Sequence, residues 1–395
     1  MKFLNVTSSL VIVLSLISAK EIPITIFIHG TISPKSNLSV HSIIKIFQDD
    51  LEKCVYKKVI EEVRQDKFFY VTQPIKKLGL KKINHKNLKE GKAANLFAHL
   101  YDNVHNQFNN SQECHYYTFG WSGLLSKKCR FTESKILYEH LKEELNKFKN
   151  KKIKLDIVGF SHGGNIALNL ADIRAKFYAE DDFKIDNLIL LGTPIQKINS
   201  HCINHDIFKN IYNFYSKYDT VQKMDFLTSK QFFSDRVFCN GFLPEKVKQV
   251  NIQVASKNLK QNIAPGHTEL WFFGWTPDNY RKSFPLHPLP VAVFLPALIN
   301  HTQKSDELKN FVIRINCHEN KVTALNKKTK IFEKQLCTNF NDMCKVALNH
   351  EPRFLNKKSL RKRMYETKMK IVKNSRSQSN RSLKVAALAN SKGQA

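Results

Sequence analysis

One segment, residues 155–168, constrains the fold of this chain more than any other. Strand-forming residues at 155–158 lead into G-F-S-H-G at 159–163, and a helix-forming run follows at once. This strand–turn–helix order is the context of a nucleophile elbow, a tight turn that holds a reactive serine above the end of a sheet. Such a turn strains the serine backbone, so small residues must flank it. The segment predicts a strand that leads directly into a helix, with Ser161 as the candidate nucleophile.

A second serine stands in a similar segment, G-W-S-G at 120–123. Leu124 occupies the place of the second motif glycine, and no clear helix follows directly. We therefore favour Ser161 over Ser122 as the nucleophile. The alternative for Ser161 is an ordinary glycine-rich loop between a strand and a helix.

Strand and helix patterns alternate along the rest of the chain. Strands are predicted at 22–29, 116–119, 153–158, 188–191, 211–215, 247–254 and 311–315, and helices at 40–63, 93–104, 132–149, from the elbow to about 175, and at 290–299. This alternation favours an α/β fold with a mostly parallel, doubly wound sheet and helices on both faces. The stretch 65–110 is polar and rich in Lys and Asn, and we expect it to form an insert or lid.

The two ends of the chain differ from this pattern. Residues 1–19 combine an early lysine, an apolar centre and a small-residue exit, which is typical of a secretory signal peptide; a membrane anchor or a buried first strand are the alternatives. We expect an exported protein, periplasmic or extracellular. The folded domain is predicted over 20–353, and a basic, disordered tail over 354–395.

Charge and cysteine content limit the partners. The formal net charge is +29, so anionic surfaces should attract the protein, and the tail could contact an anionic membrane or polymer or stay a solvated extension. No specific nucleic acid partner is expected. The eight cysteines contain no C-x-x-C pair, so the spacing predicts no metal site; export would allow disulfides whose pairing the sequence leaves open.

A serine nucleophile requires an acid and a base at the carboxyl ends of later strands. We favour Asp219 as the acid, because it lies in a polar loop just beyond the strand at 211–215. Its rivals are Asp225 and Asp206, and a turn or helix-capping aspartate is the simpler interpretation.

The base that we favour is His267, which follows the strand at 247–254 by a loop with a Pro-Gly turn. A histidine can take and return a proton near neutral pH. The alternatives are His287 and His301. For the oxyanion, two backbone N–H groups are needed. We expect them from His162, the residue after the nucleophile, and from Thr31, in the loop that closes the strand at 22–29.

Together these segments resemble the α/β-hydrolases of the lipase/esterase type. The resemblance rests on F-I-H-G-T at 27–31, G-F-S-H-G-G at 159–164, L-G-T-P at 191–194, Y-S-K-Y-D at 215–219 and G-H at 266–267. It implies a Ser–His–Asp triad of Ser161, His267 and Asp219, oxyanion donors at Thr31 and His162, and no cofactor. Its implied activity is hydrolysis of a carboxylic ester, of a lipid or another acyl compound.

Two other functions stay open at this point. The same triad serves amidases and peptidases, and a protein of the same fold could lack catalysis and bind an anionic polymer or membrane. Aromatic residues at 271–275 and the apolar run 291–299 could line an acyl pocket, but we favour ordinary core packing for both.

Overall fold

A computed structural model gives the structure of the protein. It describes residues 21–32, 40–52, 54–88, 92–108, 113–223, 234–238, 243–256, 261–276, 280–303, 309–325, 330–337, 339–352, 366, 369–370 and 373. The predicted signal peptide at 1–19 and, apart from four residues, the predicted tail at 354–395 lie outside this description.

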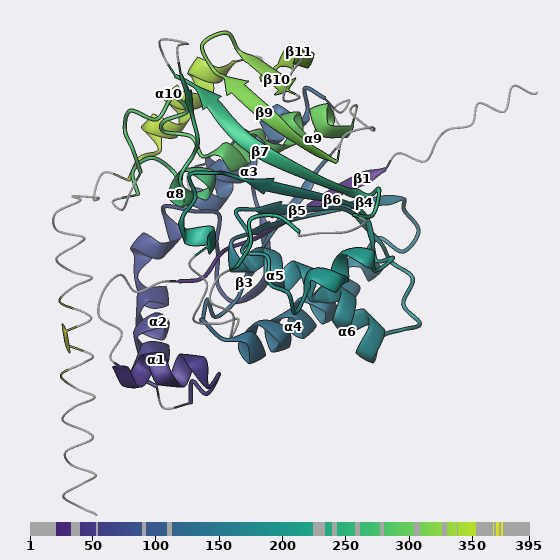
Figure 1. The fold of residues 1–395 in the computed structure, drawn as a ribbon, viewed down its shortest axis with the longest axis vertical. Helices are drawn as coiled ribbons and strands as arrows, with labels where there is room; N and C mark the ends of the chain where they lie inside the picture. Colours follow the sequence, from purple (N-terminus) through teal and green to yellow (C-terminus); the bar gives the residue numbers. More distant parts are fainter. Residues whose placement is uncertain are drawn as a thin grey trace, which may run out of the picture.

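One mixed sheet forms the centre of the molecule (Figure 1). Its parallel strands are β1 (Ile22–Ile28), β3 (His115–Gly120), β4 (Ile153–Phe160), β5 (Ile185–Leu191), β6 (Phe208–Tyr215), β7 (Val247–Ala255) and β9 (Asn310–Asn316). Four further strands pair antiparallel: β2 (Gly79–Ile83), β8 (Asn262–Ile263), β10 (Lys321–Leu325) and β11 (Lys330–Gln335). The order across the sheet is β11-β10-β9-β7-β6-β5-β4-β1-β3-β2, with β8 beside β7.

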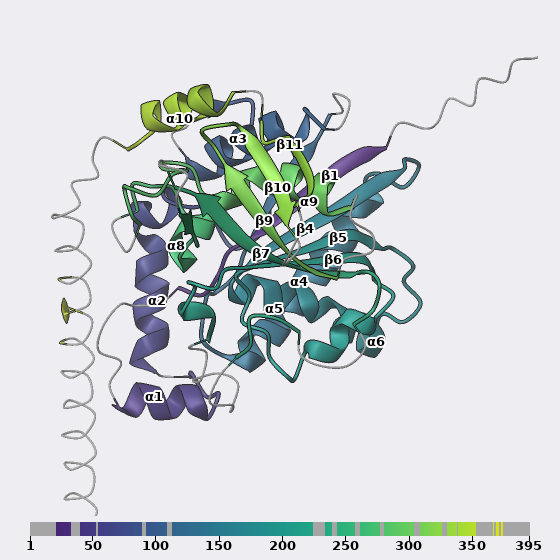
Figure 2. The same cartoon turned by 45° about the horizontal axis from the view of Figure 1, so that its top comes forward.

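Helices cover both faces of this sheet (Figure 2). On one face lie α3 (Ala93–His105) and α9 (Leu295–Gln303), packed on side chains such as Phe27 of β1. On the other face lie α4 (Lys127–Asn146), α5 (His162–Leu168) and α6 (Leu170–Phe177), packed on Ile24, Ile26 and Ile28. The central strands are continuous apolar runs because helices bury both of their faces. The predicted doubly wound α/β fold is confirmed.

The chain changes direction across the sheet at β1. From β1 it builds β3 and β2 on one side, and it then returns to place β4 to β7 on the other side. The carboxyl ends of β1 and β4 therefore meet at a topological switch point, where open α/β sheets bind their ligands. Two of the residues predicted to act on a substrate lie here: Ser161 directly follows β4, and Thr31 lies in the loop after β1.

Several element boundaries differ from prediction. The helix expected at 40–63 is two helices, α1 (Val40–Phe47) and α2 (Val55–Gln65), because the backbone leaves helical geometry at Asp49, whose φ is +55°. The helix expected at 290–299 begins as a 3₁₀ turn, Val291–Phe294, before α9. The helix after the elbow divides at Asn169 into α5 and α6. The sequence did not predict β10, β11 or α10 (Phe340–Asn349), which extend the sheet domain beyond β9.

Parts of the stretch expected to form an insert or lid belong to the sheet domain. β2 pairs with β3 at the edge of the sheet, and most side chains of α3 are buried on its face. A lid role for the rest of 65–110 stays a prediction.

The described cysteines are all free thiols: Cys54, Cys114, Cys129, Cys202, Cys317, Cys337 and Cys344. Most of them are buried. Among the described helices, none is both long and apolar enough to cross a membrane.

The burial of α3 predicts the effect of truncating its central aromatic residue. Phe97 packs edge-on against Phe27, at 5.1 Å between ring centroids, and also contacts Trp271 and Phe273. We expect Phe97→Ala to lower the free energy of unfolding by about 3–5 kcal/mol, measured by denaturant titration, because it leaves a cavity in the core. The half-exposed Asn103 on the same helix is the control, and Asn103→Ala should cost about 0.5 kcal/mol. A similarly small loss for Phe97→Ala would contradict an integral α3.

Candidate active site

Ser161 stands in a strained turn between β4 and α5. Its φ of +52° and ψ of −131° are rare for a residue with a side chain. The glycines around it are required by close backbone contacts: a Cβ on Gly159 would lie 2.5 Å from the Cα of Gly164, and one on Gly163 would lie 2.5 Å from the carbonyl oxygen of His29. The turn is fixed further because the Ser161 N–H donates to the Leu191 carbonyl of β5, at 3.0 Å. The predicted strand–turn–helix is therefore present, and Ser161 is its turn residue.

Asp219 and His267 contact each other directly. Asp219 is fully buried four residues beyond β6, and His267 begins the short helix α8 (His267–Trp271). The Oδ2 atom of Asp219 lies 2.7 Å from Nδ1 of His267, while its Oδ1 accepts the Gln222 N–H at 3.1 Å. Since a carboxylate can only accept, Nδ1 of His267 carries the proton of that bond, and Nε2 of a neutral imidazole is left as an acceptor.

The three residues gather around the carboxyl end of β5. A Cβ on Gly192, which follows β5 with a φ of +58°, would lie 3.1 Å from Oδ2 of Asp219 and 3.5 Å from Nδ1 of His267. The imidazole of His267 also lies against the ring of Phe160, with 4.6 Å between centroids, and Phe160 is the residue before Ser161. The structure thus brings the predicted acid and base into contact and places the base against the residue that precedes the predicted nucleophile.

The loops that carry the acid and the base are fastened to each other. The hydroxyl of Ser216, in the loop after β6, donates to the carbonyl of Pro265 at 2.5 Å. On the other side, the fully buried Glu269 accepts the Gly266 N–H at 2.6 Å and the Arg281 Nε–H at 2.5 Å. Sequence reasoning missed Glu269 and Arg281. The signal for Glu269 was its place three residues after Gly266, which is the spacing of a capping box.

Both predicted oxyanion residues lie next to Ser161. A Cβ on Gly30 would lie 2.7 Å from the Cβ of Ser161, so the loop after β1 passes directly over the serine, and Thr31 is the next residue. His162 is the first residue of α5. N–H groups in the first turn of a helix point away from its own carbonyls and can face a developing negative charge.

The structure places the alternative residues elsewhere. Asp225 lies outside the described residues. Asp206 is an exposed residue that forms an ion pair with Lys184. His301 is fully buried in α9. His287 packs against Tyr280, with 5.6 Å between ring centroids.

The aromatic segment after His267 forms part of the core, as we favoured. Trp271 stacks on Phe160 with 5.2 Å between ring centroids and an angle of 3° between the planes. Trp271, Phe273 and Trp275 are buried, and so is the whole run 291–299. The stack on Phe160 supports the turn at Ser161 from below.

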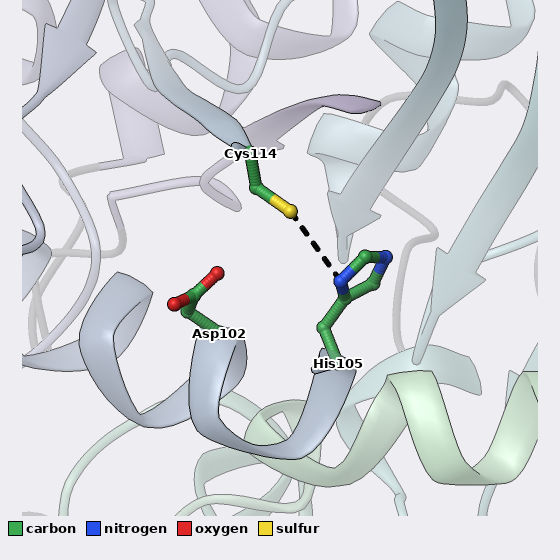
Figure 3. Close-up of side chains that lie close together, drawn as sticks. All are labelled: Asp102, His105 and Cys114. Carbon is green, nitrogen blue, oxygen red and sulfur yellow. Dashed lines mark hydrogen bonds between the residues drawn. The ribbon is translucent and has the colours of Figure 1, made fainter. Parts of the chain in front are cut away.

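Among the described residues, two groups of side chains have the residue types of metal ligands. In the first, the ligand atoms of Asp102, His105 and Cys114 all lie within 4.8 Å of one another, between the last turn of α3 and the start of β3 (Figure 3). The oxygens of Asp102 accept hydrogen bonds from Tyr116 and Asn106, and the Cys114 sulfur contacts the His105 ring at 3.4 Å. This group lies at the amino end of β3, opposite the carboxyl ends that carry Ser161. The second group contains Asp172, His201 and Cys202.

Comparisons with known proteins give only distant structural matches. No family model matches the chain, and no curated protein matches it. A protein described as a cell surface hydrolase from Lactobacillus plantarum WCFS1 is 12% identical, with a TM-score of 0.23; the match covers 75% of this chain and 83% of that one. An esterase from Pyrobaculum calidifontis is 13% identical, with a TM-score of 0.24, over 75% of this chain and 68% of that one.

The order of the strands and the positions of three loop residues define the fold. The parallel sheet reverses its strand order at β1, a strained serine turn follows the central strand β4, and an aspartate and a histidine follow later strands in that order. This arrangement is that of an α/β-hydrolase-like fold.

Proposed function

We propose that the protein is a serine hydrolase that cleaves a carboxylic ester, of a lipid or another acyl compound, through an acyl-enzyme on Ser161. The observation that carries the proposal is the 2.7 Å contact between Asp219 and His267 beside the strained turn of Ser161. A buried carboxylate that holds a histidine next to an activated serine is the constellation used for acyl transfer.

In the proposed mechanism, Oγ of Ser161 attacks the ester carbonyl while Nε2 of His267 takes its proton. Asp219 keeps the proton on Nδ1 and stabilises the imidazolium. The negative charge on the carbonyl oxygen is met by the N–H groups of Thr31 and His162. His267 then protonates the leaving alcohol, and a water molecule, deprotonated by the same histidine, releases the acid and restores Ser161.

Export and surface binding belong to the same proposal. The N-terminal signal peptide would bring the enzyme outside the cytoplasm. The net charge of +29 would favour peripheral contact with an anionic membrane or polymer through the basic tail.

Labelling with a fluorophosphonate tests the nucleophile. The probe should form a covalent adduct on Ser161, located by mass spectrometry of the modified peptide, because it reacts with serines that a base and an oxyanion site activate. Ser161→Ala should abolish labelling, and no adduct should form on Ser122, the serine of the similar segment at 120–123. An adduct that persists in Ser161→Ala would refute the assignment.

The contact between Asp219 and His267 predicts the result of removing one charge. In Asp219→Asn the amide can donate to Nδ1, which favours the tautomer that cannot accept the Ser161 proton. We expect kcat for p-nitrophenyl butyrate to fall by about 10³–10⁴-fold, with a much smaller change in KM. Equal kcat values for Asp219→Asn and the unaltered protein would exclude Asp219 as the acid.

A further inference from the structure

Three buried residues next to the loop after β1 are linked to one another by hydrogen bonds. They are Arg64, Trp121 and His29. Arg64, in the last turn of α2, donates from Nη1 to the backbone carbonyl of Trp121. The Trp121 N–H lies 3.1 Å from Nε2 of His29, and the indole Nε1–H of Trp121 donates to the His29 carbonyl at 2.7 Å. Nδ1 of His29 in turn lies 2.7 Å from the carbonyl oxygen of Gly30.

The contacts of His29 favour one tautomer of its ring. Burial, aided by the nearby Arg64 charge, holds the pKa of His29 well below its ordinary value, so the ring is neutral near pH 7. Nδ1 lies 2.7 Å from the Gly30 carbonyl oxygen, which can only accept, so in the neutral ring Nδ1 carries the proton. In that tautomer Nε2 accepts the Trp121 N–H. The Trp121 carbonyl oxygen also lies 3.2 Å from Nε2, and it accepts from Arg64.

The last hydrogen bond in this chain fixes the peptide unit that carries the Thr31 N–H. A trans peptide is planar, and its N–H points opposite to its C=O. Because His29 holds the Gly30 carbonyl on the side of Trp121, the N–H of Thr31 is directed away from Trp121. Gly30 itself lies against Ser161, since a Cβ at this position would come within 2.7 Å of the serine Cβ.

The backbone on the C-terminal side of Thr31 is also held by a hydrogen bond. The Ile32 N–H donates to the Gly123 carbonyl at 2.9 Å, and Gly123 has a φ of +75° that favours glycine. Both anchors of Thr31 thus come from the G-W-S-G segment at 120–123. Between them, neither the N–H nor Oγ1 of Thr31 has a hydrogen-bond partner among the described residues.

We propose that Arg64, Trp121 and His29 act as a positioning relay that orients the Thr31 N–H toward the oxyanion of the acyl-transfer reaction. The inference depends on the proposed function, because it assigns the relay to the oxyanion site of that reaction. It also gives a role to the G-W-S-G segment, which holds the oxyanion loop from both sides, and to an arginine that is almost wholly buried beside the ring of Phe69.

Two substitutions at His29 separate orientation from packing. In His29→Asn the amide NH₂ reaches the place of Nδ1 and can still donate to the Gly30 carbonyl. In His29→Phe a ring that can stack on Trp121 and lie edge-on to Phe69 stays, but the donor is lost. With p-nitrophenyl butyrate, we expect His29→Phe to lower kcat by about 10–100-fold with little change in KM, since loss of one oxyanion donor costs about 10²–10³-fold. His29→Asn should recover most of the rate.

Binding of a boronic acid gives a readout that a general loss of structure would not reproduce. An alkyl boronic acid adds to the serine and places an oxygen in the oxyanion site. In His29→Phe its Ki should rise by the same factor by which kcat/KM falls, while KM stays nearly constant. Equal losses in His29→Phe and His29→Asn, or a Ki that does not change, would overturn the relay.

A second pair of variants tests the relay at Arg64. It also keeps the proposal testable if His29→Phe does not fold. Arg64→Lys keeps a donor for the Trp121 carbonyl, and Arg64→Met removes it. We expect a kcat loss of about 10-fold in Arg64→Met and a smaller one in Arg64→Lys, and equal values in both would contradict the relay. Failure of the proposed function itself would look different, because the unaltered protein would then neither turn over the ester nor react with the fluorophosphonate.

Discussion

The close backbone contacts at the Ser161 turn are the constraint on which the rest of the site depends. A non-glycine residue at φ +52° carries a strain of about 1–3 kcal/mol. The turn persists because the glycines at 159 and 163 let the backbones around it come into close contact. The Ser161 N–H also donates a hydrogen bond to β5. The stack of Phe160 on Trp271 adds apolar support directly beneath it. Larger residues at 159 or 163 would separate the helix from the sheet and remove the serine from the switch point.

Three separate loops reach this serine, and each is held by its own polar contacts. The loop after β6 carries Asp219, the loop after β7 carries His267, and Ser216 connects the two. The loop after β1 is held independently by Trp121 and Gly123 from the end of β3. β1 and β3 are neighbours in the sheet. Their pairing therefore sets the distance between the loop after β1 and the segment after β3 that holds it. The geometry of the site is therefore a consequence of the parallel sheet and not of the loops alone.

Local patterns in the sequence were sufficient to predict the elements around Ser161. The strand–turn–helix at β4 and α5 and the buried strands β5, β6 and β7 are read from glycine positions and apolar runs, which report local backbone demands. The strands β10 (K-V-T-A-L) and β11 (K-I-F-E-K-Q) were missed because each is short and neither contains a sustained apolar run. The helix at 93–104 was predicted, but its packing on the sheet was not, because the composition of residues 65–110 is polar; Phe97, Leu100 and Tyr101 of α3 are buried. Contacts between residues distant in sequence, such as Glu269 with Arg281 and Arg64 with Trp121, carry no local pattern and required the structure.

Two of the polar side chains buried near the site, Arg64 and His29, are not needed to fill space in the core. A buried arginine or histidine is destabilising unless its hydrogen bonds are satisfied, since desolvation costs several kcal/mol per charge. Arg64 meets part of that cost with a backbone carbonyl, and its Nη2 has no partner among the described residues. An apolar residue of similar volume would pack there at a lower cost, yet it could not hold the Trp121 carbonyl or, through Trp121 and His29, the Gly30–Thr31 peptide. The site therefore trades stability for a fixed peptide orientation, which is the form that electrostatic preorganisation takes when the donor is a backbone N–H.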